Sequence, residues 1–197
     1  LSSSGTDTYS VIAASLGSLK GSRHGGANIK VVQMMQDLKR HVTDWNDEDA
    51  IRIYLSNVLN KNAFDQTGLI YGMGHAVYSL SDPRANILKS FAQKVSMEKN
   101  RSAEYNLYEL VSRLAPEVIC EERKIFKGVS PNVDFYSGFV YELLAHLSQL
   151  YTPIFAIARV VGWSAHRIEE IASDGKIMRP AYMSMMEHRQ YYPIEQR

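Results

Sequence analysis

Residues 81–99 read SDPRANILKSFAQKVSMEK. The start signal and the helical spacing of apolar residues in this stretch are typical of the whole chain. Asp82 is a typical N-cap residue, and Pro83 is favoured at the first position of a helix. Helical periodicity then continues over about four turns. The stretch therefore predicts a helix that begins at Asp82 and Pro83 and leaves Arg84 in its first turn.

Helical periodicity also dominates on both sides of this stretch, and no strand pattern of any length interrupts it. The sequence therefore predicts an all-α fold. The other segments with helical periodicity are residues 7–19, 27–42, 44–61, 103–124, 132–150, 154–162 and 163–173.

Capping residues, charges and prolines predict where several helices begin, end or bend. Asp7 is a plausible N-cap for the first helix. The segment 44–61 has an acidic first turn and a basic last turn, which the helix dipole favours. Pro116 predicts a kink or a restart within 103–124, and Pro153 is expected to start the next helix.

The composition is that of a globular chain without a strong charge. The chain has 197 residues, enough for one core or for part of a larger two-domain protein. Its 22 Lys and Arg residues against 21 Asp and Glu residues leave a formal net charge of +1, so no global field favours nucleic acid or an anionic membrane. No apolar run approaches the roughly 20 residues of a membrane-spanning helix.

The single cysteine, Cys120, excludes an internal disulfide framework and a cysteine-rich zinc site. We therefore expect a reducing compartment, by default the cytoplasm. The chain begins without Met and enters helical pattern almost at once, which leads us to expect the cut end of a longer chain.

Three breaks between helices place a polar side chain near a helix N-terminus. His24 stands just before GGAN, Arg84 follows Asp82 and Pro83, and Asp134 follows Ser130 and Pro131. Free N–H groups and the positive end of the helix dipole favour anions at such ends. A pocket in which several of these ends converge would bind carboxylates or phosphates.

The helix dipole also suggests how His24 and Asp134 divide the chemistry. It favours a neutral His24 ring, which can donate one hydrogen bond to a developing oxyanion. It favours the Asp134 carboxylate, a general base at neutral pH unless burial raises its pKa. This pairing removes a proton next to a carbonyl group. Taken singly, each residue is more simply explained as a capping, solvated or surface residue.

His75 lies between apolar residues in a loop that Gly72 and Gly74 open, which lets the backbone come close to another group. The loop is not a dinucleotide motif, because GMGHAV lacks the GxGxxG spacing and follows no strand. The histidines also show no metal-ligand spacing such as HExxH. We expect neither a metal site nor a phosphate loop.

Five segments, in order, resemble the citrate synthase family. GMGHAVYSLSDPRA (72–85) resembles the family signature, GSRHGGAN (21–28) its histidine segment, and PNVDFYSG (131–138) its aspartate segment. FAIARVVGWSAH (155–166) and KIMRP (176–180) resemble its later arginine-bearing segments. The resemblance covers essentially the whole chain.

The resemblance implies the condensation of oxaloacetate with acetyl-CoA to give citrate and CoA. Asp134 would take a proton from the acetyl methyl group while His24 hydrogen-bonds the thioester oxygen. His75 would polarise the ketone of oxaloacetate. The resemblance also implies three arginines that hold carboxylates: Arg84, Arg159 and, from the other subunit of a homodimer, Arg179.

The resemblance also implies that acetyl-CoA is a co-substrate that contacts Gly72, Gly74 and Ala76, with no permanently bound cofactor. Ser79 departs from the family, which commonly has a basic residue there for the CoA phosphates. CoA binding would then be weaker or would use Arg23, Lys89 or another base.

The family architecture implies a large-domain segment and hinge over residues 1–26, a small domain over 27–139 and a large-domain segment over 140–197. Family chains are about twice as long, so we expect this chain alone to be inactive or nearly so. Three alternatives stay open: a 2-methylcitrate synthase that uses propionyl-CoA, a noncatalytic assembly or ligand-binding fragment, and a lyase that splits citryl-CoA.

Overall fold

The computed structural model describes residues 1–21, 24–124, 128–173, 175–179 and 190–196, together with the single residues 181, 183, 185 and 187. Within these residues no strand occurs, and extended pairing is limited to one isolated antiparallel bridge between Met73 and Pro131. The predicted all-α fold is confirmed. The α-helices are α1 (Thr8–Leu19), α2 (Ala27–His41), α3 (Glu48–Leu59), α4 (Pro83–Glu98), α5 (Ser102–Arg123), α6 (Val133–Leu143) and α7 (Tyr151–Ala172).

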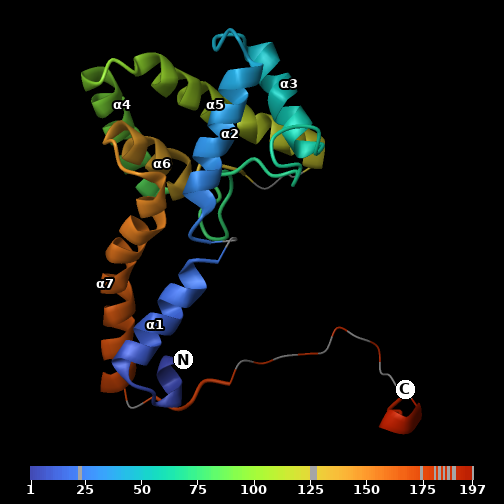
Figure 1. The fold of residues 1–197 in the computed structure, drawn as a ribbon, viewed down its shortest axis with the longest axis vertical. Coiled ribbons are helices and arrows are strands. Elements are labelled where there is room, and N and C mark those ends of the chain that lie inside the picture. The colour runs from blue at the N-terminus through green and yellow to red at the C-terminus, as the bar shows by residue number, and fades with distance from the viewer. Residues whose placement is uncertain are drawn as a thin grey trace.

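Helices α2 to α6 form one packed group, in the upper half of Figure 1. Helix α6 packs against both α2 and α4, and α3 packs against α5. The main hydrophobic core lies within residues 31–143 and includes the fully buried Phe135 and Phe139 of α6. Helix α6, which carries Asp134 in its first turn, therefore contacts helices on two sides.

The closest approach between α2 and α6 depends on Gly138. A Cβ atom there would lie 2.6 Å from Val32 Cγ2 and 2.8 Å from the backbone oxygen of Asn28. Only glycine fits without a shift of the helices. This contact brings the N-terminal part of α2, which follows His24, against the helix that carries Asp134.

Helices α1 and α7 lie side by side below this group (Figure 1). They bury few residues: Val11 and Leu19 in α1, and Tyr151 in α7. After α7 the described parts of the C-terminal segment run away from the helices (Figure 1). In the part of the chain that the structure describes, no helix, α7 included, has the length and apolar character to cross a membrane.

The expected caps at two helix starts are confirmed. The Asp7 side chain accepts a hydrogen bond from the Ser10 N–H at the start of α1. The Asp82 side chain accepts one from the Arg84 N–H, and Pro83 is the first residue of α4. Each carboxylate satisfies an N–H group that has no partner within its helix.

Three expectations about helix ends need correction. Helix α5 runs through Pro116 without a restart, because the buried Leu114 and Val118 on either side hold that face in the core, while the alternative of a kink stays a prediction. Lys61 is not in the last turn of α3, since it lies beyond the cap residue with a φ of 64°. Helix α7 starts at Tyr151, so Pro153 lies within its first turn, where a missing N–H costs no helical hydrogen bond.

Candidate functional site

The loop between α3 and α4 is tied to the segment before α6. The Gly74 N–H donates to the Ser130 carbonyl at 2.8 Å, and the Asn132 N–H donates to the Gly72 carbonyl at 2.9 Å. Gly72 has a φ of +81°, and a Cβ atom there would lie 2.9 Å from Phe135. The close approach at Gly72 is therefore internal to the protein, whereas the space beside Gly74 is open.

The His75 ring is oriented by the loop that follows it. Its Nδ1 atom accepts hydrogen bonds from the backbone N–H groups of Val77 at 3.0 Å and Tyr78 at 3.3 Å. The neutral ring therefore carries its proton at Nε2, because Nδ1 is already an acceptor. The Tyr78 ring lies against it, with 5.0 Å between the ring centroids.

Asp82 fixes the guanidinium of Arg84. The Arg84 Nε donates to Asp82 Oδ1 at 3.0 Å, and the Arg84 Nη2 donates to Asp82 Oδ2 at 2.8 Å. Asp82 is 1% exposed, whereas the Arg84 side chain is 39% exposed. The buried carboxylate thus takes one edge of the guanidinium and leaves Nη1 and the second proton of Nη2 for another acceptor.

Arg84 and His75 converge on one point. The Arg84 Nη2 lies 3.3 Å from the His75 Nε2. Since Nη2 is a donor and the neutral His75 ring also donates from Nε2, the two groups do not satisfy each other. A ligand oxygen that lies beside both nitrogens, at about 3 Å from each, would accept from both.

Burial and neighbouring groups shift the pKa values of Asp82 and Asp134 in opposite directions. Burial by itself raises the pKa of Asp82 and is the largest contribution, but the hydrogen bonds from Arg84 and from the Val133 N–H together hold that pKa below its usual value. Burial also raises the pKa of Asp134, and the positive charge of Arg84 acts in the opposite direction. Hydrogen bonds of Asp82 and Asn132 tie the start of α6, which carries Asp134, to the segment that carries His75 and Arg84.

His24 belongs to the junction between α1, α2 and α7. Its N–H donates to the Gly21 carbonyl at 3.0 Å, while the neighbouring Gly25 carbonyl accepts from Thr152 Oγ1 at 2.7 Å. The His24 and Phe155 rings meet edge to face, with 6.0 Å between their centroids. The Arg159 guanidinium lies 4.9 Å from the centre of the same Phe155 ring.

His24 and Arg159 also line one pocket of about 230 Å³ between α1 and α7. The structure thus brings together two groups of predicted residues. His75, Arg84 and Asp134 form one group, and His24 and Arg159 form the other. The close contact of α2 with α6 at Gly138 connects the two groups, because His24 precedes α2 and Asp134 lies in the first turn of α6.

Three other predicted residues stand apart from these groups. Arg179 is exposed in the segment that follows α7 and joins neither group within this chain. Lys89 forms an ion pair with Glu109 of α5, so its charge is already compensated. Arg23 lies outside the described residues.

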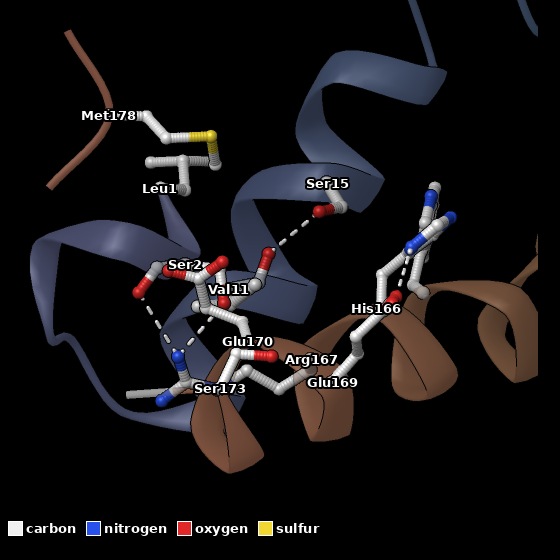
Figure 2. Close-up of a pocket in the computed structure, with 11 residues that line it drawn as sticks. Leu1, Ser2, Val11, Ser15, His166, Arg167, Glu169, Glu170, Ser173 and Met178 are labelled. Atoms are coloured by element: carbon white, nitrogen blue, oxygen red, sulfur yellow. Dashed lines mark hydrogen bonds and ion pairs between the residues drawn. The ribbon is translucent and has the colours of Figure 1, made fainter. Parts of the chain in front are cut away.

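A larger hollow of about 500 Å³ lies beside the lower part of α7, between that helix, α1 and the first residues (Figure 2). The Arg167 guanidinium points toward Ser2 and donates to its carbonyl at 3.1 Å and to its Oγ at 2.9 Å. None of the predicted site residues lines this hollow. Among the described residues no cluster of three or more His, Cys, Asp or Glu side chains could hold a metal ion.

The sequence did not identify Asn132 or Phe155 as parts of the site. Asn132 was visible only as the residue that separates Pro131 from Val133 and Asp134, and an Asn before a helix is usually no more than a cap. Phe155 lies on an apolar helix pattern, where an aromatic side chain is normally a core residue. Their contacts join segments that are distant in the sequence.

The described residues thus form a helical protein in which His75 and Arg84 lie close together and His24 and Arg159 line one pocket. Residues 1–181 match the family model described as "Citrate synthase, C-terminal domain". The chain belongs to the citrate synthase family.

Curated relatives and solved structures agree with this assignment. The chain is 40% identical over 194 residues to the citrate synthase of Synechocystis, with 98% of this chain and 44% of the relative covered. It is 35% identical over 192 residues to citrate synthase 2 of Bacillus subtilis, with 98% of this chain and 46% of the relative covered.

Among solved structures, citrate synthase from Thermotoga maritima matches with a TM-score of 0.71 and 34% identity, over 100% of this chain and 49% of that one. The enzyme from Thermoplasma acidophilum, solved with carboxymethyl coenzyme A and oxaloacetate, matches with a TM-score of 0.72 and 30% identity, over 98% of this chain and 48% of that one. The chain therefore spans less than half the length of these relatives.

Proposed function

We propose that the candidate site catalyses the condensation of oxaloacetate with acetyl-CoA to citrate and CoA. The site would act within a longer protein that includes the part of the citrate synthase chain that precedes this one in the relatives. The observation that carries the proposal is that the Arg84 Nη2 lies 3.3 Å from the His75 Nε2, in a segment that Asn132 ties to the Asp134 backbone at the start of α6. The Thermoplasma structure supports both substrates, because it holds oxaloacetate and a CoA analogue.

In the first step Asp134 takes a proton from the methyl group of acetyl-CoA. His24 donates a hydrogen bond to the thioester oxygen, where negative charge develops as the enolate forms. A base with a pKa raised by burial is a stronger proton acceptor than an exposed carboxylate. The dipole of α6 and the positive charge of Arg84 oppose this rise in pKa and favour the ionised form.

In the second step the enolate carbon attacks the ketone carbon of oxaloacetate. The ketone oxygen accepts from His75 Nε2, which supplies the proton as the new C–C bond forms. The free edge of Arg84 holds a carboxylate of the same substrate, because a guanidinium matches a carboxylate with two parallel hydrogen bonds. Water then hydrolyses the thioester and releases CoA.

Arg159 holds a second carboxylate beside His24, from the pocket that both residues line. Arg179 completes the clamp from the other subunit of a homodimer, which is consistent with its exposed position here. Residues 27–139 form the small domain, residues 1–26 and 140–197 belong to the large domain, and residues 21–26 form the hinge. Closure at this hinge would exclude water from the enolate.

Release of the CoA thiol tests this function. The chain is produced alone and also joined to the preceding segment of the Synechocystis relative, and each protein receives oxaloacetate with acetyl-CoA or propionyl-CoA. We expect thiol release from the joined protein with acetyl-CoA and little from the chain alone. Faster release with propionyl-CoA would identify a 2-methylcitrate synthase, and no release with either donor would remove the synthase proposal.

A further inference from the structure

Asn132 joins the segment that carries His75 to the segment that carries Asp134 through one side chain. Its Oδ1 accepts a hydrogen bond from the Asp134 N–H at 3.0 Å. Its Nδ2 donates to the Gly74 carbonyl at 2.8 Å, immediately before His75. One amide group thus links the backbone of the residue proposed as base to the backbone next to the residue proposed to polarise the ketone.

Asp82 provides a second link between the same two segments. Its Oδ2 accepts from the Val133 N–H at 3.2 Å as well as from Arg84. The isolated bridge between Met73 and Pro131 adds a backbone link. The start of α6 and the loop that carries His75 are therefore held together at several points.

The amide of Asn132 does more than a helix cap requires. Asn, Asp and Ser cap a helix about equally well, because each offers an oxygen to the N–H groups of the first turn. Only Asn among them also offers two N–H donors on the same group. The hydrogen bond to the Gly74 carbonyl needs such a donor. A serine side chain is one atom shorter, so its hydroxyl cannot reach this carbonyl while it caps α6.

We propose that Asn132 is a positioning residue that fixes the distance between Asp134 and the His75–Arg84 pair. The proposal rests on the proposed function. There His75 donates a proton to the ketone of one substrate and Asp134 takes a proton from the methyl group of the other, so the two residues must lie at a fixed distance. Misplacement of reacting groups by about 1 Å can cost on the order of 100-fold in rate. Loss of the link should therefore slow turnover more than it weakens binding.

Asn132→Ser separates the link from the cap, because Ser keeps a capping oxygen, adds no charge and loses the donor to Gly74. We expect faster hydrogen–deuterium exchange of the backbone N–H groups at positions 74 and 132 in the 197-residue chain. In the joined protein we expect kcat to fall by about 10–100-fold, with KM for oxaloacetate within about 2-fold and an unchanged pH dependence of kcat. Asn132→Asp also keeps the cap and should show the same faster exchange, in case the Ser variant folds poorly.

Asp47→Ser is the matched control, because Asp47 caps α3 by accepting from the Ala50 N–H and lies outside the site. It should leave both amides and kcat unchanged. Unchanged exchange in both Asn132 variants, or faster exchange with unchanged kcat in Asn132→Ser, would overturn the proposal. If the unmodified joined protein releases no thiol, the proposed function fails, and the exchange data alone then decide whether Asn132 holds the two segments together.

Discussion

At the scale of single residues, Asp134 shows how a residue proposed as a catalytic base can reduce stability. Its carboxyl group is partly buried in the first turn of α6, and burial raises its pKa. A raised pKa means that the folded state holds the proton more tightly than the unfolded state does. The stabilising effect of the protonated form is complete below the ordinary value of 3.8 and is lost as the pH rises through the raised pKa.

We therefore expect Asp134→Asn to raise the midpoint of thermal unfolding at pH 7, because the amide is neutral and has the same shape. The gain should disappear at a pH below the ordinary value of 3.8. Asp49→Asn is a suitable control, since Asp49 is also the second residue of its helix but is exposed. That control should lose a little stability, because it removes a charge that favours the helix dipole. A lower midpoint for Asp134→Asn at pH 7 would contradict this explanation.

The sequence indicated which residues are unusual, but it did not predict which residues they contact. Asp82 was visible as a cap, but its hydrogen bond to Val133 depends on the packing of α4 against α6. Similarly, Gly72 was expected to let the backbone approach another group, and its close neighbour is Phe135 of the same chain. Local pattern shows which residues are unusual, whereas long-range packing decides what they touch.

At the scale of helices, the contact between α2 and α6 sets the position of both His24 and Asp134. Gly138→Ala should destabilise the fold by roughly 1–3 kcal/mol, because the added methyl group meets Val32 and the backbone of Asn28. Gly17→Ala in α1 should instead stabilise by about 0.4–1 kcal/mol, since a Cβ atom there has no neighbour within 4 Å. Urea denaturation measures both changes. Equal effects of the two substitutions would argue against a close helix contact at Gly138.

Helix α5 illustrates the limit of prediction at this scale. Proline inside a helix removes one hydrogen bond and usually ends or bends the helix. Here the same face of α5 buries Val111, Leu114 and Val118, so core packing keeps the helix continuous across Pro116. Periodicity predicted the existence and type of the helices well, but a local rule about proline carries no information on what the helix packs against.

At the scale of the whole molecule, the core is unevenly distributed. The main core lies within residues 31–143, whereas α7 buries only Tyr151 among its 22 residues. Ile157, Val161 and Ile168 are all more than half exposed on α7. We therefore expect α1 and α7 to open more readily than the packed group of α2 to α6.

Hydrogen–deuterium exchange measures this difference directly. In the 197-residue chain the amides of α7 should exchange faster than those of α5, although both helices have 22 residues. In the protein joined to the preceding segment of the Synechocystis relative, the α7 amides should become more protected. Equal protection of α5 and α7 in the chain alone would contradict an uneven core.

The central claim is that Asp134 removes a proton from the methyl group of acetyl-CoA. The most direct test follows the exchange of the acetyl methyl protons with deuterium in D₂O, by NMR, in the joined protein with a keto acid bound that does not react further. We expect exchange with Asp134 present and a loss of several orders of magnitude in Asp134→Asn. Methyl exchange at the same rate in both proteins would contradict the account.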